Sequence, residues 1–570
     1  MTTRFFRLIL SGLTVISVTM SVTRAQLPAT RLDGLYPAGT SAGSTVTVTI
    51  HGTDLDDVSK LLFSHAGITA TPVMTEPTVF DPEPLPVTNQ FLITAAADVP
   101  PGQYEVRANG RFGLSNPRSF IVSQAREVVE TEPNNDAAEA TVVEIPAVVN
   151  GQASGSADVD WYRFSGTAGQ RLLVKGFGRQ IDSLIELSLS VSTPSGQVLA
   201  ESPIGNPGTP LLDFRLPADG EYLLKVHDAL FRQGDGYHYR IELGSLPHLE
   251  YIDPPAVAAG QTAEVTVFGH NLPGGQLTDL TVDGVRLESV TTQVTMPPDI
   301  VGSLRYTGRV EPHQAFLDGI EFRMQSEGRS SNPLLIPAAP AALTPEAAND
   351  DPLAPQQLTL PAGIAGQFYP VRDVDWYQFE ATKDDVWVID VCSQRLGLPT
   401  DPAIMLQRVV PPADGADSQE PTYRDVIFLD DVQVRNVNNR SGQHEFDEST
   451  SDPIWEFRVP EDGTYRLLVR DGYSAVKSDP RLCYVLSIRK PQPDFRLVAV
   501  ADGSNGSLML RKGGRDVIHV IAGRQDGFAG EITVTATGLP EGMTAEPIVI
   551  GPDNSFGTIV LTAAADAKPV

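Results

Sequence analysis

The heptapeptide DVDWYRF at residues 158–164 returns almost unchanged as DVDWYQF at residues 373–379, 215 positions later. In the first copy, Tyr162 and Phe164 share one face of an extended segment, and Trp161 shares the other face with Arg163. A period of two is typical of a β-strand with one buried face. One of the two aromatic faces must therefore lie in a core, and we expect structural packing rather than ligand binding.

Other landmarks recur around this heptapeptide in the same order, which indicates an internal duplication. Ser-Asn-Pro occurs at 115–117 and again at 331–333. PADGEYLLKVHD at 217–228 returns as PEDGTYRLLVRD at 460–471, now 243 positions later. The chain therefore contains two copies of one unit. The larger last separation places an insertion in the second copy, around residues 411–421 and 436–451.

Short runs of alternating polarity continue along the whole chain. In STVTVTI at 44–50, Val46, Val48 and Ile50 share one face while threonines share the other. The 49 Gly and 46 Pro residues separate such runs, and helical periodicity is almost absent. The sequence therefore predicts an all-β fold of tandem β-sandwich modules, arranged as beads on a string.

The segment 128–244 resembles the bacterial pre-peptidase C-terminal domain. It carries Glu-Pro-Asn-Asn-Asp at 132–136, Asp-x-Asp-Trp-Tyr-x-Phe at 158–164, and a strand that begins Gly-Glu-Tyr at Gly220. The segment 345–489 keeps the last two signatures but opens with Pro-Glu-Ala-Ala-Asn-Asp. The resemblance implies two jelly-roll-like sandwiches.

The segments 31–122 and 249–337 resemble immunoglobulin-like IPT/TIG modules. Both have a Pro and a Gly before an alternating strand, then Gly-(Thr/His)-(Asp/Asn)-Leu and a closing Ser-Asn-Pro. The predicted division has a signal peptide and five modules. In order, these are a signal peptide at 1–25, IPT/TIG-like at 26–125, pre-peptidase-like at 126–246, IPT/TIG-like at 247–341, pre-peptidase-like at 342–492, and an Ig-like module at 493–570 that looks cut before its last strands.

The first residues predict export. Arg4 and Arg7 precede an apolar stretch from Leu8 to about Val22, and Thr-Arg-Ala follows at 23–25. We expect a secreted, cell-surface or periplasmic protein. No later stretch reaches about 18 uninterrupted apolar residues, so no membrane span is expected in the mature chain. An uncleaved N-terminal anchor is the alternative.

Acidic residues dominate the charge. The chain has 42 Lys and Arg against 71 Asp and Glu, a formal net charge of -29. This balance argues against a nucleic-acid partner, which would need clustered basic residues. Two interpretations remain open: self-repulsion that keeps the chain soluble, or carboxylates that hold cations.

The only two cysteines, Cys392 and Cys483, fall in one predicted module of an exported chain. VWVIDVCS and RLCYVLSI both have the composition of strands, and we expect a disulfide between these neighbouring strands. In the first copy, His238 takes the place of Cys483. Two unpaired buried thiols are the alternative, because sequence does not supply the Cα separation that bonding requires.

The acidic linker of the first copy is the best candidate for a ligand site. In collagenase relatives of the pre-peptidase family, a comparable linker and a strand-edge aspartate hold calcium between modules. The resemblance carries this implication to Glu130, Glu132, Asn134, Asn135 and Asp160, with Asp158 as a companion. The alternative is a solvated linker in which Asn and Asp make turns. The second copy has a weaker set, Glu346, Asn349, Asp350, Asp373 and Asp375.

No catalytic motif stands out. The nine histidines are scattered without His-Glu-x-x-His, and no phosphate-binding loop occurs. Gly39-Thr-Ser-Ala-Gly43 matches Gly-x-Ser-x-Gly, but a strand rather than a helix follows it.

We therefore expect no enzyme but an exported surface or matrix protein that acts in adhesion, in binding or as a scaffold. Its partner would be an extracellular protein or polysaccharide. The alternative is a non-catalytic accessory region of a larger secreted peptidase or other hydrolase, with the catalytic domain beyond Val570.

Overall fold

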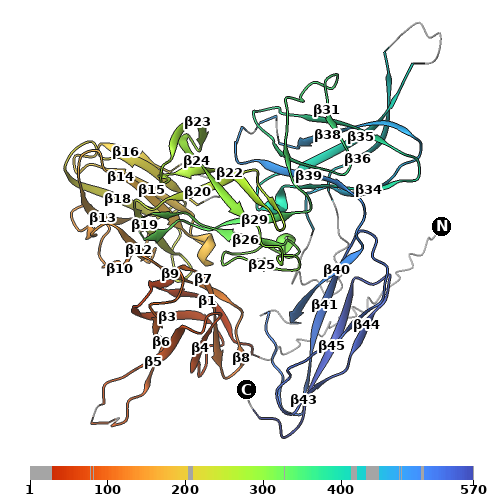
Figure 1. Cartoon of the computed structure of the whole chain (residues 1–570). Helices are drawn as coiled ribbons and strands as arrows, with labels where there is room; N and C mark the ends of the chain where they lie inside the picture. The colour runs from red at the N-terminus through yellow and green to blue at the C-terminus, as the bar shows by residue number, and fades with distance from the viewer. Residues whose placement is uncertain are drawn as a thin grey trace, which may run out of the picture.

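The computed structural model is almost entirely β (Figure 1). It describes residues 28–77, 79–80, 82–202, 209–326, 328–412, 420–431, 449–473, 475–476, 478–501 and 506–568. The predicted signal peptide and most of the predicted insertion lie outside these residues. Apart from strands, the described elements are three single turns of 3-10 helix: η1 (Arg179–Ile181), η2 (Pro312–Gln314) and η3 (Gln394–Leu396). The predicted all-β fold of tandem β-sandwiches is confirmed, and we group the strands into five modules by their sheets.

Module 1 packs a sheet of order β1-β3-β6-β5 on a second of order β2-β9-β7-β4. Alternating residues such as Val48, Ile50 and Phe91 fill the space between them, as the period of two requires. Asn116 of the Ser-Asn-Pro landmark accepts a hydrogen bond from Leu32 N at 2.9 Å. The strands are β1 (Arg31–Tyr36), β2 (Gly39–Ser41), β3 (Thr45–Thr53), β4 (Lys60–Phe63), β5 (Ile68–Met74), β6 (Pro86–Ala95), β7 (Gly102–Gly110), β8 (Gly113–Leu114) and β9 (Arg118–Ser123).

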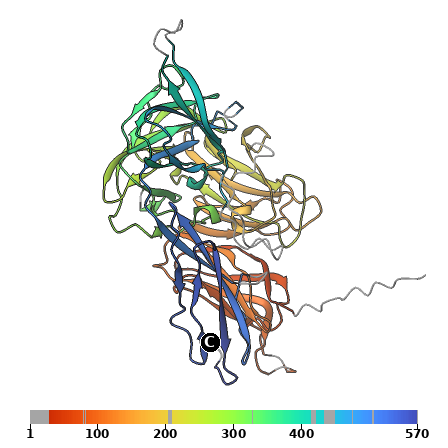
Figure 2. The same ribbon diagram turned by 90° about the vertical axis from the view of Figure 1, so that its right-hand side faces the viewer.

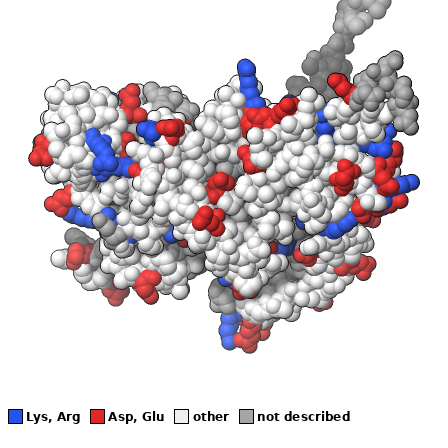
Figure 3. All heavy atoms as spheres, turned by 45° about the horizontal axis from the view of Figure 1, so that its top comes forward, with Lys and Arg blue, Asp and Glu red and all other residues white. Residues whose placement is uncertain are grey.

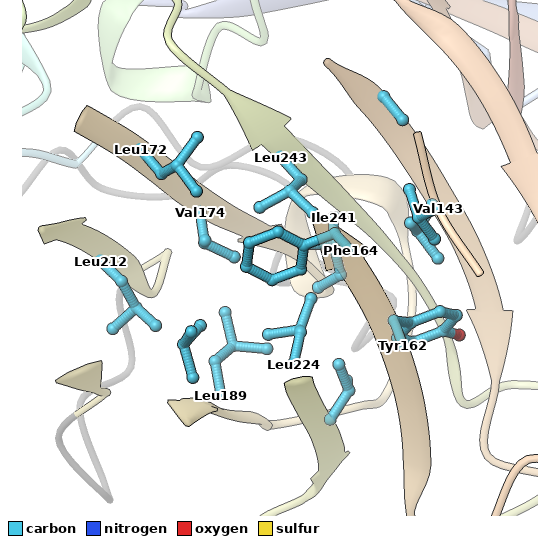
Figure 4. Packing of buried hydrophobic residues seen from close by; sticks show 14 of the residues in the cluster. Val143, Tyr162, Phe164, Leu172, Val174, Leu189, Leu212, Leu224, Ile241 and Leu243 are labelled. Atoms are coloured by element: carbon cyan, nitrogen blue, oxygen red, sulfur yellow. The ribbon is translucent and has the colours of Figure 1, made fainter. Parts of the chain in front are cut away.

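Module 2 packs two five-stranded sheets, β10-β12-β19-β14-β17 and β11-β13-β18-β15-β16. Tyr162 and Phe164 lie on the buried face of strand β13. The Phe164 ring lies among Leu224, Ile241 and other aliphatic side chains (Figure 4). Trp161 lies on the other face, with the Lys225 ammonium 5.7 Å from its ring centroid. The strands are β10 (Arg126–Val129), β11 (Thr141–Val142), β12 (Ala147–Gln152), β13 (Asp160–Gly166), β14 (Arg171–Phe177), β15 (Leu187–Ser192), β16 (Val198–Glu201), β17 (Leu211–Arg215), β18 (Gly220–Asp228) and β19 (His238–Gly244).

Module 3 repeats the plan of module 1, with sheets β20-β22-β24-β23 and β21-β29-β26-β25. Asn332 accepts from Leu249 N at 2.8 Å, so the second Ser-Asn-Pro makes the same contact as the first. The strands are β20 (His248–Asp253), β21 (Val257–Ala258), β22 (Thr262–His270), β23 (Gln276–Val282), β24 (Val285–Thr295), β25 (Leu304–Arg305), β26 (Gly319–Phe322), β27 (Gln325–Ser326), β28 (Arg329–Ser330) and β29 (Leu334–Ala339).

Module 4 repeats module 2 strand for strand, with sheets β30-β32-β39-β34-β37 and β31-β33-β38-β35-β36. Tyr377 and Phe379 take the buried places of the first copy. The strands are β30 (Thr344–Pro345), β31 (Gln356–Leu358), β32 (Ala362–Gln367), β33 (Asp375–Ala381), β34 (Val386–Cys392), β35 (Pro402–Val410), β36 (Thr422–Leu429), β37 (Ile454–Arg458), β38 (Gly463–Asp471) and β39 (Cys483–Arg489).

Module 5 has one sheet of order β40-β41-β45-β43 and a β42-β44 pair. Aliphatic residues such as Val520, Ile550 and Leu561 form its core. The strands are β40 (Asp494–Ala501), β41 (Arg515–Gln525), β42 (Ile532–Val534), β43 (Met543–Ala545), β44 (Ile548–Ile550) and β45 (Phe556–Ala563).

The modules contact one another well beyond their linkers. Modules 1 and 5 lie side by side in both views of the chain (Figures 1 and 2). There Ser507 Oγ donates to Leu114 O at 2.7 Å and Arg107 to Gly506 O at 3.2 Å. Arg171 of module 2 forms one ion pair with Asp213 of its own module and another with Glu288 of module 3. The tandem modules are therefore joined by side-chain contacts as well as by their linkers.

The predicted disulfide is not formed, because Cys392 and Cys483 are both free thiols. They do lie on paired strands, β34 and β39, but Cys392 faces Val485 in the register. Cys483 is thus a diagonal neighbour, and the Cβ atoms of such pairs are farther apart than the roughly 4 Å of a disulfide. Each thiol instead packs against module 3: Cys483 joins Tyr251 and Leu287, and Cys392 lies against a cluster with Ala256 and Ala339.

Charged side chains of both signs are spread over the face in Figure 3, with Asp and Glu in the majority and no broad basic area. The Gly-x-Ser-x-Gly match also has no catalytic setting, because Ser41 ends strand β2 and a turn leads into β3 rather than into a helix.

Candidate metal centre

The acidic linker of module 2 runs from the end of β10 towards β13 and is fixed there by its backbone. Trp161 N donates to Asn134 O at 2.9 Å. Through this bond the linker reaches the start of β13, where Asp160 lies. One ligand atom each of Glu130, Glu132 and Asp160 lies within 4.8 Å of the other two. The structure therefore brings together three of the predicted carboxylates.

Glu130 is held by donors from two modules. Its Oε1 accepts from Gln152 N at 2.7 Å and from the Tyr36 hydroxyl of module 1 at 3.1 Å. Its Oε2 accepts from the Tyr162 hydroxyl at 3.0 Å. Burial, which outweighs these hydrogen bonds, raises the pKa of Glu130 to about 7. A cation that replaced the proton would relieve this cost.

Asp160 is buried at the edge of β13 and accepts from the Tyr239 hydroxyl. Burial and the neighbouring Glu130 carboxylate raise its pKa to about 8. Asn134 is fully buried beside it, with the end of its side chain 3.2 Å from Glu132 Oε2 and 3.1 Å from Asp160 Oδ1. If the amide nitrogen is the atom at these distances, it donates to both carboxylates. If oxygen does, three oxygens converge as they do around a cation.

Two of the predicted residues lie beside this cluster rather than in it. Asn135 Oδ1 accepts from Val159 N at 3.3 Å, so the side chain serves the linker backbone. Asp158 Oδ2 accepts from Ser154 N at 2.6 Å, while its buried Oδ1 has no partner among the described residues. Asp158 therefore adds negative charge near Asp160 and shapes the preceding loop, but lies outside the set of close ligand atoms.

The second copy also brings three carboxylates together, but from other positions. Asp375 takes the place of Asp160, whereas Asp350 and Asp373 take the places of Asn135 and Asp158. Asp350, Asp373 and Asp375 each offer a ligand atom within 4.8 Å of the others. The end of the Asn349 side chain lies 3.0 Å from Asp375 Oδ1, and Asp375 accepts from the Tyr484 hydroxyl at 2.7 Å. Burial raises the pKa of Asp375 to about 9 and that of Asp373 to about 7.

Glu346 completes this second group. Its Oε2 accepts from Gln367 N at 3.0 Å, and burial raises its pKa to about 7. Asp253 of module 3 takes the place that Tyr36 has in the first copy, since both precede the proline that follows the first strand of their module. The second junction therefore has a carboxylate where the first has a phenol.

The donor set fits calcium better than other common metals. Every side-chain donor in the first cluster is an oxygen, and Ca²⁺ takes six to eight oxygen ligands. No Cys or His belongs to either group of close ligand atoms, which argues against zinc. Among the described residues, no Lys or Arg forms an ion pair with Glu130, Glu132 or Asp160. Three carboxylates without a basic partner leave room for a hard cation.

The tyrosine hydroxyls are the part of the site that sequence reasoning missed. For the aromatic residues of DVDWYRF only packing was expected, yet the Tyr162 hydroxyl lies 2.6 Å from that of Tyr239 and also reaches Glu130. Tyr377 and Tyr484 repeat the contact at 2.6 Å. The alignment of His238 with Cys483 was the available signal, because a tyrosine, Tyr239 or Tyr484, follows directly in each copy.

Comparisons with known proteins add little to this site. No protein-family model and no curated protein matches the chain. Among solved structures, the pre-peptidase C-terminal domain of a Bacillus anthracis collagenase matches with a TM-score of 0.16 and 16% identity, over 20% of this chain and 99% of its own. The Bacteroides ovatus mixed-linkage glucan protein SGBP-B, solved with a heptasaccharide, matches with a TM-score of 0.14 and 9% identity, over 80% of this chain and 72% of its own.

The tandem carbohydrate-binding modules of a Streptococcus pneumoniae family 98 glycoside hydrolase match with a TM-score of 0.13 and 11% identity, over 60% of this chain and 83% of their own. TM-scores this low carry no inference about function. Within the described residues, none of the helices has the length and apolar character to cross a membrane.

Proposed function

We propose that the chain is an exported, non-catalytic binding or scaffold protein whose module junctions are stiffened by calcium. The observation that carries this proposal is the pair of oxygen-only acidic clusters, one at the start of each pre-peptidase-like module. Its partner would be an extracellular protein or polysaccharide. The module boundaries near residues 125, 246, 341 and 492 are part of the same proposal.

Calcium at the first cluster would act on a hinge. Glu130 and Glu132 belong to the linker, Asp160 belongs to β13, and Tyr36 of module 1 donates to Glu130 at 3.1 Å. An ion shared by the linker and the sandwich would fix the linker and, through Tyr36, the angle between modules 1 and 2. Because the ion binds the folded state, it would also stabilise the protein by mass action.

The test is thermal unfolding of the full exported chain in chelator and in millimolar calcium. We expect the melting temperature to rise with calcium, with a dissociation constant on the order of 10⁻⁴ to 10⁻³ M. At 100 times that constant, an ion adds about 2.7 kcal/mol to the free energy of unfolding. Asp160→Asn with Glu132→Gln should remove the response of the first site, and Asp375→Asn that of the second.

The matched control is Glu139→Gln, because Glu139 is an exposed carboxylate of the same linker that lies outside the cluster. It should keep the full calcium response. If calorimetry of the wild-type chain detects no heat of calcium binding and the melting temperature does not move, the acidic linkers are solvated spacers.

A further inference from the structure

A cavity of about 400 Å³ lies where modules 1, 2 and 3 meet. Module 1 lines it with the start of β7 and the end of β9, and module 2 with β12, β14 and β19. Module 3 closes it with the loop at 306–309 and with residues 329–333. This volume falls in the lower part of the range of small-molecule sites, which is about 300 to 1,000 Å³. The cavity therefore fits a compact ligand rather than a folded partner.

Lys175 is the polar group that most needs a ligand. Its ammonium nitrogen lies 3.4 Å from His248 Nδ1 and 5.0 Å from the Phe177 ring centroid. Within the described part of the chain, no carboxylate lies within ion-pair distance of it. Burial and the Lys175 charge lower the pKa of His248 to about 4, so this neighbour is neutral. Burial also lowers the pKa of Lys175 itself, and the carboxylates of Glu242, its cross-strand neighbour on β19, and of Glu250 offset this only in part.

The other charged groups around the cavity are mostly basic. Arg309 and Arg323 face it from module 3 with Arg329, and among the described residues Glu242 is the carboxylate that lines it. The Arg309 side chain is 54% exposed and has pairs at 3.1 Å with Glu311 and 3.7 Å with Asp182, which leave several of its N–H donors available. Arg323 in turn pairs with Glu321, so the carboxylates of Asp182, Glu311 and Glu321 balance much of this positive charge.

The rest of the lining is part apolar and part polar. Phe177 and Tyr306 present half-buried rings, and Ile121 and Leu211 contribute aliphatic surface. Amide and hydroxyl groups lie among them: Gln103, Ser123, Gln180, Thr209, Thr307 and Ser330. Such a lining suits a ring with an apolar face and hydroxyl groups at its rim.

We propose that this cavity binds a uronate, a sugar that bears a carboxylate. The carboxylate pairs with the Lys175 ammonium and reaches Arg309 of module 3, whose planar donors match a carboxylate. The sugar ring lies against Phe177 or Tyr306. This inference rests on the proposed binding role and names its ligand class, but it is independent of the calcium clusters, because none of their carboxylates lines the cavity.

The experiment is calorimetric titration of the full chain with D-glucuronate and D-galacturonate. D-Glucose tests the need for the carboxylate, and cyclohexanecarboxylate tests the need for hydroxyl groups. We expect a uronate to bind and both analogues to bind at least tenfold more weakly. If no uronate binds the wild-type chain, or if cyclohexanecarboxylate binds as well as the uronates, the proposal is wrong.

Variants locate the ligand. Lys175→Met keeps the alkyl stem and should weaken uronate binding at least tenfold, whereas Lys225→Met, which removes a cation of the same module outside the cavity, should not. Gly102→Trp should abolish binding by filling the cavity, since a Cβ at Gly102 meets no atom closer than 3.7 Å. Uronate binding that survives Gly102→Trp overturns the location.

The calcium response of each variant serves as the test of folding. It also separates this proposal from the proposed function. A chain that responds to calcium but binds no uronate contradicts the cavity assignment alone. A chain that binds a uronate without any calcium response contradicts the calcium-stiffened junction alone.

Discussion

At the scale of single residues, the duplication shows how one position serves two chemistries. Cys483 and His238 begin the equivalent strands β39 and β19, and both are buried. Cys483 packs against Tyr251 of module 3, while the His238 ring lies 6.1 Å from the His51 ring of module 1. In both copies this position therefore faces the preceding module rather than a partner within its own sandwich.

The free thiols lead to a prediction about labelling. The denatured, unreduced protein should react with a thiol reagent at two sites per chain, because neither cysteine is in a disulfide. The native protein should react slowly, since burial raises the pKa of the Cys483 thiol and reduces its thiolate. Mass spectrometry after labelling counts the sites. If the denatured, unreduced chain is recovered without any label, the two cysteines form a disulfide after all.

At the scale of elements, strands were predictable and the contacts around them were not. The alternation in DVDWYRF required one of its two aromatic faces to be core but did not say which, and the structure buries Tyr162 and Phe164. The same alternation does not state which hydroxyl meets which carboxylate. The contact from Tyr36 to Glu130 depends on how two modules pack, over a separation of 94 residues.

The acidic linker should also make stability depend on pH when calcium is removed. Glu130 and Asp160 have folded pKa values of about 7 and about 8, above those of ordinary carboxyls. The folded state then holds protons that the unfolded state has released. Their contribution is fully present below about pH 4 and is lost as the pH rises through 7 to 8.

We expect the free energy of unfolding in chelator to fall by several kcal/mol between pH 5 and pH 8, because Glu346, Asp373 and Asp375 of the second copy titrate in the same range. Asp160→Asn should reduce this fall, because an amide does not titrate, and Glu139→Gln should leave it unchanged. Saturating calcium should abolish much of it. Denaturant titrations at several pH values measure each case. A pH dependence that Asp160→Asn does not alter would contradict the raised pKa.

At the scale of the whole molecule, a buried network of charges joins three modules. Arg171 and Asp213 of module 2 meet His270 of module 3, whose Nδ1 lies 3.1 Å from Asp213 Oδ2. A carboxylate oxygen of Glu250 in module 3 lies 3.6 Å from His270 Nε2. The other oxygen accepts a hydrogen bond from Arg481 of module 4 at 3.1 Å. Removing any one of these side chains would leave the charges beside it buried without an opposite charge.

His270 makes this network sensitive to alkaline pH. Burial lowers its pKa, but hydrogen bonds to Asp213 and Glu250 outweigh burial and raise it to about 9. The contribution of the imidazolium, about 3 kcal/mol, is fully present below about pH 6.5 and is lost as the pH rises through 9. Raising the pH from 7 to 10 should therefore loosen modules 2 and 3.

Hydrogen exchange measures this change at the interface strands β17 and β22. Exchange there should speed up at high pH, after correction for the intrinsic rate, in the wild-type chain. His270→Gln should exchange fast at both pH values, because the amide does not carry the charge. His227→Gln is the control, since His227 lies in module 2 against Phe231 and outside the network. Equal protection at pH 7 and pH 10 would exclude the imidazolium from the interface.

The contact between modules 1 and 5 changes how the molecule would carry mechanical load. A linear row of sandwiches transmits tension from each module to the next. Here the hydrogen bonds of Ser507 and Arg107 tie the first module to the last, so tension between these two modules meets that tie before it reaches the modules between them. These few hydrogen bonds would then break first under load, and their rupture would lengthen the molecule while every sandwich stays folded.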